Sequence, residues 1–469
     1  MSTTPALLVG GVSSGCGKTT ATLGLMVALA RRGLTVQGFK VGPDYIDPGL
    51  HGLVTGRPSW NLDGWMGDRA SLVRAFGRVM SGDVWSAGGL QAGPDIGIVE
   101  GVMGLFDGAD GASDRGSSAE VAAWLDIPVV LVVDVRGLSR SVAAIARGYA
   151  SMREDLRFGG VIATRVASPN HANLLREAMR STCPDIPLLA CLPLDDTLTR
   201  PSRHLGLITA EDGPLPPQQQ DALAAWFADN ADMDALIRLA RNGGVPRPVE
   251  ETPAVPRRAR IAIARDEAFC FVYPAFLDAL DRAGAEIVFF SPMRDVAVPA
   301  CDGVWLPGGY PELYATRLSE NRAMAQSLRE AALRVPVHGE CGGYIWLLES
   351  LEVEGQRYPM SGCLPGAARL GVRRAALGYR SLSLCEDHPL GLAGTLLRGH
   401  EFHYSALIGE VQQLYAGDVR PLWTVADRQG RPLSFEGLRR GMISGTWIHL
   451  HPDCDAAMVA RFVRACVRT

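Results

Sequence analysis

Residues 10 to 20, GGVSSGCGKTT, combine closely spaced glycines with a lysine and two threonines. Glycines let backbone N–H groups converge on an anion, a lysine adds charge, and a hydroxyl can bind Mg²⁺, so this stretch predicts a phosphate-binding loop. Val12 stands where the GxxxxGK[ST] spacing places its first glycine, which we interpret as another variety of the same loop. The alternative is a tight glycine turn before an ordinary helix. The expected nucleotide contacts are Gly15, Gly17, Lys18, Thr19 and Thr20.

Three carboxylates follow apolar runs in the same part of the chain: Asp44 and Asp47 in FKVGPDYIDPG, and Glu100 in DIGIVEG. Open α/β sheets bind ligands at the carboxyl ends of their strands, and a magnesium nucleotide site needs a carboxylate there. We therefore expect ligand contacts from Asp44 and Glu100, and we leave open whether Asp47 contacts a ligand or caps a turn.

A second chemical centre is predicted around VPVHGECGGYIWLLESL, in which an apolar run meets a glycine-flanked Cys341 and a helical pattern follows. This order resembles a nucleophile elbow, and a helix N-terminus is expected to lower the pKa of the thiol. A cysteine nucleophile needs an imidazole partner, which GTWIHLHPD supplies with His449. Backbone N–H groups of glycines in WLPGGYPELY and after the cysteine could stabilise an oxyanion, and Gly309 and Gly342 are the candidates.

The remaining nine cysteines are interpreted as packing residues, because no CxxC pair occurs and all ten are scattered singly. A competing interpretation is a metal site made of His400, His403, His449 and His451. It is disfavoured because their surroundings are β-like, where residues i and i+3 point to opposite faces.

These groups must be positioned by two α/β regions. From residue 1 to about 195, near-continuous apolar runs alternate with helical stretches, a pattern typical of a parallel sheet covered on both faces. A second α/β pattern begins at 260, after a proline-rich stretch without periodicity. We predict two doubly wound α/β domains, 1–240 and 260–469, joined by a linker, 241–259.

The composition favours a small substrate over a macromolecular one. The 469 residues carry 46 basic and 50 acidic side chains, so no overall positive field indicates binding to nucleic acid or to a membrane surface. Apolar runs are far shorter than the ~20 residues of a transmembrane helix, and the N-terminus does not resemble a signal peptide. We expect a cytoplasmic enzyme with reduced thiols; a homodimer is left open.

Together, GVSSGCGKTT, FKVGPDYIDP, WNLDGWM, EGVMGLFDG, LPGGYPE, HGECGGY and GHEFHYS resemble the cobyrinate or hydrogenobyrinate a,c-diamide synthases of cobalamin biosynthesis. In that family a dethiobiotin-synthetase-like P-loop domain is fused to a class I, flavodoxin-like glutamine amidotransferase domain. The resemblance spans essentially the whole chain and implies ATP and Mg²⁺ as cofactors, and L-glutamine and a corrin polycarboxylate as substrates. The metal contacts that it implies are Thr19, Asp44 and Glu100, and the expected substrate contacts are Asp44, Tyr45 and Asp47.

The implied reaction couples two sites. Cys341 and His449 release ammonia from glutamine, and ATP activates the a and c acetate carboxylates as acyl phosphates for amidation. Sibling amidases, cobyric acid synthase or nickel-sirohydrochlorin a,c-diamide synthase, are alternatives. A nucleotide switch of the partitioning-ATPase type, with the second half as a docking module, is the rival from another class.

One departure concerns the histidine. Many class I amidotransferases carry a glutamate two residues after it, and this chain has His451 at that position. The resemblance therefore assigns no residue that orients His449.

Overall fold

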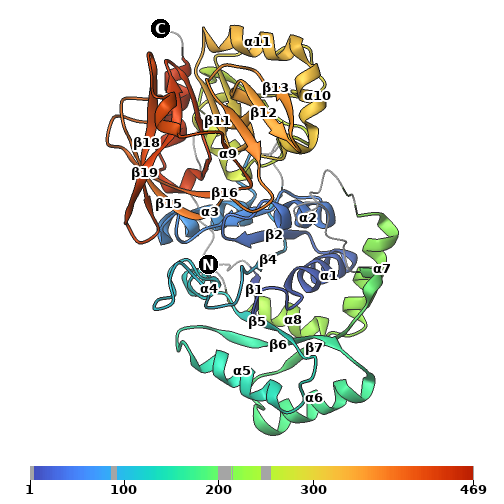
Figure 1. The fold of residues 1–469 in the computed structure, drawn as a ribbon. Coiled ribbons are helices and arrows are strands. Elements are labelled where there is room, and N and C mark those ends of the chain that lie inside the picture. Colours follow the sequence, from blue (N-terminus) through green and yellow to red (C-terminus); the bar gives the residue numbers. More distant parts are fainter. Residues whose placement is uncertain (1–4, 86–91, 199–212, 214, 244–254, 468–469) are drawn as a thin grey trace. The chain divides into compact units, whose positions relative to one another are not determined.

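The structure, a computed structural model, describes residues 5–85, 92–198, 213, 215–243 and 255–467. The chain forms two compact units, Met1–Glu250 and Glu251–Thr469, which we describe separately (Figure 1). Most of the predicted linker, 241–259, lies outside the described residues, so the predicted domain limits stay a prediction. No helix in the described part of the chain is long and apolar enough to span a membrane.

The N-terminal unit is built on one parallel sheet. Its described residues form seven strands in the order β3-β2-β4-β1-β5-β6-β7, and every neighbouring pair is parallel. The central strands are buried along nearly their whole length, which confirms the parallel sheet predicted from continuous apolar runs. The strands are β1 (Ala6–Gly11), β2 (Val36–Val41), β3 (Trp60–Leu62), β4 (Ile96–Glu100), β5 (Val129–Asp134), β6 (Phe158–Val166) and β7 (Leu188–Pro193).

Helices connect these strands, and several begin at a clear cap. Asp68 and Ser71 form a capping box, and the Ser168 side chain accepts a hydrogen bond at the start of a helix whose first residue is Pro169. The first helix packs against the second and the seventh. The helices are α1 (Lys18–Arg31), α2 (Ile46–Thr55), α3 (Arg69–Ser81), α4 (Ser118–Leu125), α5 (Ser141–Ser151), α6 (Pro169–Thr182), α7 (Pro217–Ala228) and α8 (Met233–Ala240).

Strand order explains where the N-terminal site forms. Because β2, β4 and β1 are neighbours and parallel, their carboxyl ends meet at one edge of the sheet. The glycine-rich loop follows β1, the FKVGPD segment ends β2, and Glu100 ends β4. Three distant sequence segments are thereby brought to one edge, where open α/β sheets bind ligands.

The C-terminal unit has a mixed sheet. Its described residues form ten strands in the order β21-β16-β15-β18-β19-β20-β11-β10-β8-β9, in which the last five are parallel and the others pair antiparallel. The parallel part matches the predicted doubly wound domain, whereas the sequence did not predict the antiparallel extension. The strands are β8 (Ala259–Ala264), β9 (Ala285–Phe290), β10 (Gly303–Leu306), β11 (Val337–Glu340), β15 (Ala376–Leu384), β16 (Leu396–His403), β18 (Val419–Asp427), β19 (Pro432–Arg440), β20 (Ile443–Thr446) and β21 (Ile448–Leu450).

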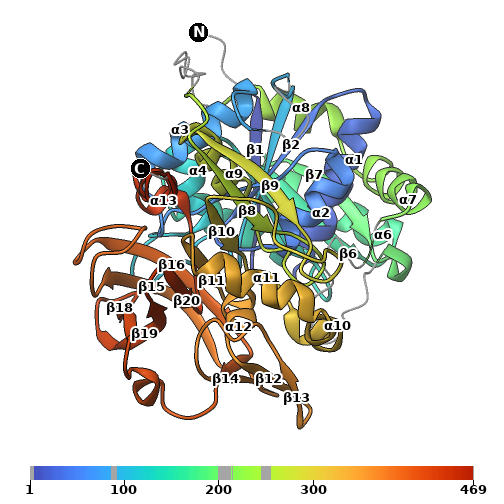
Figure 2. The ribbon, with the colours of Figure 1, turned by 90° about the horizontal axis from the view of Figure 1, so that it is seen from above.

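A small second sheet and five α-helices complete the described part of this unit. The small sheet has the order β13-β12-β14-β17, and its strands β12 and β13 contact α12 and α10 respectively (Figure 2). Its strands are β12 (Ser350–Val353), β13 (Gln356–Pro359), β14 (Ala367–Leu370) and β17 (Ser405–Leu407). The helices are α9 (Pro274–Arg282), α10 (Ala315–Glu320), α11 (Arg322–Ala332), α12 (Gly342–Leu347) and α13 (Met458–Cys466).

Candidate functional site

The glycine-rich loop has the backbone that a phosphate cradle requires. Gly15 and Gly17 have φ values of 75° and 93°, in the left-handed region that glycine adopts at little cost. Gly17 is the N-cap of α1, and Lys18 is its first residue. The Lys18 ammonium donates to the carbonyl of Ser13 at 3.0 Å, so the side chain lies across the loop. Thr19 and Thr20 follow in the first turn and are half-buried.

The loop is also held from the neighbouring strands. The Thr164 hydroxyl donates to the carbonyl of Cys16 at 2.7 Å, and the Arg165 guanidinium donates to that of Gly15 at 2.9 Å. Val12, in the place of the missing glycine, donates its N–H to Val132, and its carbonyl accepts from the Tyr149 hydroxyl at 2.9 Å. The departure from the usual spacing is therefore accommodated by specific hydrogen bonds.

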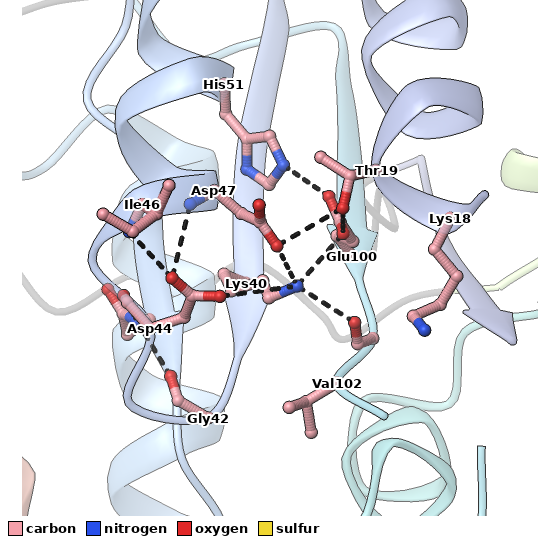
Figure 3. Close-up of polar contacts among 12 residues, drawn as sticks. Lys18, Thr19, Lys40, Gly42, Asp44, Ile46, Asp47, His51, Glu100 and Val102 are labelled. Carbon is pink, nitrogen blue, oxygen red and sulfur yellow. Dashed lines mark hydrogen bonds and ion pairs between the residues drawn. The ribbon is translucent and has the colours of Figure 1, made fainter. Parts of the chain in front are cut away.

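Next to the loop lies a buried cluster of charges (Figure 3). The Thr19 hydroxyl donates to Glu100 Oε1 at 2.7 Å and lies 3.4 Å from Asp47 Oδ2. Between the two carboxylates lies the Lys40 ammonium, 2.6 Å from Asp47 Oδ2, 3.0 Å from Glu100 Oε1 and 3.2 Å from the Gly101 carbonyl. We call Thr19, Lys40, Asp47 and Glu100 the carboxylate–lysine cluster.

Asp44 lies at the margin of this cluster and has a local role. Its Oδ1 accepts from the backbone N–H of Ile46 at 2.7 Å and of Asp47 at 3.3 Å, so it caps the start of α2. Its Oδ2 is 3.9 Å from Lys40 Nζ. The capping role that we left open for Asp47 is thus performed by Asp44, and Asp47 faces Thr19 instead. Tyr45 is the half-buried residue that precedes α2.

The segment WNLDGW packs against the turn that carries Asp44. Asn61 donates to the carbonyls of Gly42 and Asp44 at 2.8 and 2.7 Å, which fixes the turn that carries Asp44. Trp60 and Trp65 are buried, as is Asn61. This segment therefore packs under the site.

Sequence reasoning missed two members of the site, Lys40 and His51. The His51 Nε2 lies 2.8 Å from Glu100 Oε2, and its Nδ1 lies 3.0 Å from the Ser59 hydroxyl, so the ring holds the second oxygen of Glu100. A signal for Lys40 was available: the sequence contains only two lysines, Lys18 and Lys40, among 46 basic residues. A chain that uses arginine almost everywhere keeps lysine at the two positions of this site.

The charges of the cluster compensate one another. Burial opposes ionisation of Glu100, but the charge of Lys40 and the hydrogen bonds from His51 and Thr19 hold the pKa of Glu100 below its ordinary value. Burial alone would lower the pKa of Lys40, and the charges of Glu100 and Asp47 raise it instead. Burial, followed by the charge of Glu100, raises the pKa of Asp47. The arrangement offers hard oxygen ligands and a fixed cation beside a helix N-terminus, which suits Mg²⁺ and phosphate.

In the C-terminal unit, Cys341 lies on a strained turn between β11 and α12. Its φ of 46° and ψ of −101° are unusual for a residue with a side chain. The turn is closely packed, because a Cβ on Gly343 would lie 2.0 Å from the carbonyl oxygen of Leu306. The Cys341 N–H donates to the carbonyl of Thr446 at 2.7 Å, which ties the turn to the strand before His449. This is the elbow that the sequence predicts.

The strain predicts a difference between two variants that both lack the thiol. Cys341→Gly relieves a backbone cost of roughly 1–3 kcal/mol, while glycine adds about 0.5–1 kcal/mol of entropy loss on folding. Cys341→Gly is therefore expected to unfold at a higher temperature than Cys341→Ala, as measured by calorimetry. Equal melting temperatures would show that the turn is unstrained.

The other predicted residues of this site surround the elbow. A Cβ on Gly308 would lie 2.3 Å from Cε1 of His449, so the imidazole packs on the PGG loop. A Cβ on Gly342 would lie 3.0 Å from the backbone nitrogen of Gly309, which places the two oxyanion candidates next to each other. The Cys341 sulfur lies 3.9 Å from the carbonyl oxygen of Phe402 on β16.

The prediction that the helix lowers the thiol pKa is wrong. Burial, followed by the nearby charge of Glu312, raises the pKa of Cys341 well above its ordinary value. The helix α12 has only six residues, and the side chains around the thiol include the carboxyl groups of Glu312, Glu340 and Glu401. The resting thiol is therefore neutral and needs a base.

His449 has the properties of such a base. Burial, with smaller effects of His400 and His403, lowers the pKa of His449 to about 3. The ring is therefore uncharged at neutral pH and can accept a proton. Nδ1 of His449 lies 3.8 Å from Oε2 of Glu340, and Glu340 is the residue just before the cysteine.

The histidines of GHEFHYS have other partners. The ring of His403 stacks on Trp447, and its nitrogens lie 2.6 Å from the Ser405 carbonyl oxygen and 2.8 Å from Glu401 Oε1. His400 is the cross-strand neighbour of His449. In the described ranges, no three His, Cys, Asp or Glu side chains are grouped as metal ligands.

Two family models match the chain. Residues 7–208 match a CobQ/CobB/MinD/ParA nucleotide binding domain, and residues 260–457 match a CobB/CobQ-like glutamine amidotransferase domain. The first includes the glycine-rich loop and the carboxylate–lysine cluster, and the second includes the elbow and His449.

Known proteins of similar length resemble the whole chain. The cobyrinate a,c-diamide synthase of Syntrophotalea carbinolica is 43% identical over 98% of this chain and 98% of its own. Two hydrogenobyrinate a,c-diamide synthases, from Rhodobacter capsulatus and Agrobacterium fabrum, are 44% and 42% identical, each over 95% of this chain and 98% of their own.

Proposed function

This chain belongs to the family of cobyrinate and hydrogenobyrinate a,c-diamide synthases, and from that premise we propose that it amidates the a and c acetate carboxylates of such a corrin acid. It is a glutamine-dependent ligase of cobalamin biosynthesis. The observation that carries the proposal is the presence in one chain of both required centres, a strained cysteine elbow with a neutral histidine and a phosphate loop with a carboxylate–lysine cluster.

At the elbow, Cys341 attacks the side-chain amide of L-glutamine. Because its thiol is neutral, His449 takes the thiol proton as the C–S bond forms and later donates it to the departing ammonia. The backbone N–H groups of Gly309 and Gly342 stabilise the oxyanion. Water then cleaves the thioester, which releases glutamate and restores the thiol.

At the glycine-rich loop, the phosphates of ATP bind to the N-terminus of α1. Gly15 and Gly17 shape the loop, Lys18 contributes charge, and Thr19 and Thr20 lie at the start of the helix. A corrin carboxylate becomes an acyl phosphate and ADP is released; ammonia then displaces phosphate and forms the amide.

The carboxylate–lysine cluster fits Mg²⁺, because it offers a hydroxyl and two carboxylates as hard oxygen ligands. We assign metal binding to Thr19, Asp47 and Glu100. Asp44, also expected as a ligand, lies at the margin with Tyr45, and we place both toward the corrin substrate. Bound Mg²⁺ supplies charge neutralisation for the phosphates. Lys40 holds both carboxylates and adds a positive charge at the transferred phosphoryl group.

The test is amidation by the purified chain with ATP, Mg²⁺ and glutamine, using cobyrinate and hydrogenobyrinate separately. Relatives named for each substrate are equally similar, so both acids must be tried. We expect one acid to become the a,c-diamide, identified by mass spectrometry and NMR. Amides at other positions, or ATP hydrolysis without any amide, would overturn the proposal.

His51 is expected to act through Glu100. Replacing His51 by alanine removes the partner of Glu100 Oε2, and outer-shell partners of metal ligands are worth about 10–100-fold in metal affinity or activity. His51→Ala should therefore raise the Mg²⁺ concentration for half-maximal amidation about tenfold or more. Titrating Mg²⁺ in the ammonia-driven reaction measures this. His51→Gln, which keeps a donor, should lose less, and equal losses would contradict the positioning role.

A further inference from the structure

The residue that orients His449 is not where the class I pattern places it. Position 451 holds a buried histidine whose Nδ1 accepts from the Asp453 N–H and whose ring contacts Tyr273 edge-on. A neutral imidazole that must accept a thiol proton at one nitrogen needs a partner that keeps the proton on the other.

We infer that Glu340, the residue directly before the nucleophile, is the positioning residue of His449. Its Oε2 lies 3.8 Å from Nδ1 of His449, and both side chains are buried. This inference rests on the proposed function, because it concerns the glutaminase step of that reaction. The nucleophile and the group that orients its base would then be consecutive residues of one strand–turn.

The backbone holds the Glu340 carboxyl group against the strand that carries His449. Glu340 Oε1 accepts from the N–H of Leu450 at 3.1 Å, one residue after the histidine. The Cys341 N–H is hydrogen-bonded to Thr446 on the preceding strand. The end of β11 is therefore fixed at two points along residues 446–450, and a small movement of the ring would complete the contact with Nδ1.

A second imidazole faces the same carboxyl group. His338 Nε2 lies 3.9 Å from Glu340 Oε1, and its Nδ1 lies 2.8 Å from the Ser444 hydroxyl. Among the described residues, His338 Nε2 has no hydrogen-bond partner. When Ser444 donates to Nδ1, the ring proton is on Nε2 and points toward Glu340. Two rings thus flank one carboxyl group and can stabilise it as a carboxylate.

The protonation state of Glu340 then controls the base. Burial raises the pKa of Glu340 to about 8, so a large part of the group is protonated at neutral pH. A protonated Glu340 would donate to Nδ1 of His449 and leave the proton on the nitrogen that must accept from Cys341. An ionised Glu340 accepts from Nδ1–H and stabilises the imidazolium that forms when the S–H bond breaks. The titratable groups that face Glu340 are His338, His449 and the Cys341 thiol.

The test compares glutamine hydrolysis by wild type and Glu340→Gln over a range of pH. The amide keeps an oxygen for the Leu450 N–H and cannot carry charge. We expect kcat to fall about 10²-fold or more, with KM for glutamine within about threefold, since the corresponding amide change in a Ser-His-Asp triad costs roughly 10⁴-fold. In wild type, the rate of glutamine hydrolysis should rise as the pH approaches about 8. This rising part of the pH profile, the pH limb, should be absent in the variant.

Glu436→Gln is the matched control. Burial raises the pKa of Glu436 to about 8 as well, and its carboxyl group bonds the Thr446 hydroxyl at 2.5 Å and the Trp447 N–H at 2.8 Å. It therefore tests the loss of a half-buried carboxyl group on β19 that bonds Thr446 and Trp447, the two residues at the start of the segment that carries His449. Glu436→Gln should keep kcat within about threefold and retain the pH limb, since no proton transfer depends on it.

The inference is overturned if Glu340→Gln loses no more activity than Glu436→Gln, or if its pH limb remains. Ammonia-driven amidation should be unchanged in both variants, which shows that each is folded. If Glu340→Gln does not fold, Glu340→Asp carries the test: it should lose kcat and keep the limb, and wild-type kcat would overturn the inference. A wild-type chain that hydrolyses no glutamine would instead refute the proposed function, and this inference with it.

Discussion

Replacing Cys341 by alanine is expected to abolish glutamine-driven amidation and to leave ammonia-driven amidation at the wild-type rate. The thiol forms a covalent bond in the first reaction only, and losing a nucleophile of this kind costs about 10⁴-fold or more in kcat. The variant lacks only one sulfur atom and keeps the backbone contact with Thr446, so the second site should be unaffected. Amide formation from glutamine and from ammonia, measured in parallel on the same protein, gives the two rates.

Cys363→Ala is the matched control for this change. Cys363 is a buried thiol of the same unit, near the Ser361 hydroxyl, and burial raises its pKa as well. It should retain both reactions. A Cys341→Ala variant that still uses glutamine would remove the assigned nucleophile, and loss of both reactions would show that the two centres cannot be separated by this change.

Much of the N-terminal site could be predicted from the sequence because its signals are local. Fifteen consecutive residues contain the strand, the glycine turn, Lys18, Thr19 and the start of the helix in that order. No contact with a distant segment is needed to interpret them. Glu100 could be placed because it ends an apolar strand in a parallel sheet, where strand ends meet at one edge.

What could not be predicted depends on contacts between distant segments. Asp44 and Asp47 are three residues apart, and which one faces Thr19 is decided by where α2 begins. His51 reaches Glu100 from a helix, across 49 positions of sequence. The sequence prediction was based on carboxylates and glycines, and neither indicates that a cation lies at the centre of the cluster. Lys40 was therefore missed, although it is one of only two lysines in the sequence.

The cysteine site shows a different limit. The elbow and its histidine follow from sequence patterns, but the state of the thiol follows from its surroundings. Burial, followed by the charges of Glu312 and Glu340, raises the pKa of the thiol, which is the reverse of the shift that the pattern suggests. Burial also lowers the pKa of His449 to about 3, so its ring is uncharged at neutral pH, which supports the proposed proton transfer from thiol to imidazole over a preformed thiolate.

The second large effect is expected at Lys40. Its buried ammonium contacts Asp47, Glu100 and the Gly101 carbonyl, so Lys40→Ala leaves the buried carboxylate of Glu100 and the half-buried one of Asp47 without their cation. Leaving buried charge uncompensated costs about 3–5 kcal/mol of unfolding free energy. Removing a fixed electrostatic group from a transition state costs about 10²–10³-fold in kcat. Amidation from both glutamine and ammonia should fall by this factor, while glutamine hydrolysis in the other unit continues.

Three further variants separate the role of Lys40 in the reaction from its role in stability. Gln37→Leu changes a buried polar residue of the same strand, β2, whose amide bonds the Gly38 and Pro58 carbonyls and Arg57, so it should lower stability and spare amidation. Lys40→Arg keeps the charge but places a planar fork where a compact ammonium fits, so it should restore stability without restoring the rate. Denaturant unfolding and ammonia-driven kcat, measured on each protein, give the two quantities. If Lys40→Arg recovers both together, the lysine serves only to neutralise the carboxylates, and the phosphoryl group must be stabilised by Lys18 alone. Lys18→Ala would then abolish amidation while leaving the carboxylate–lysine cluster intact.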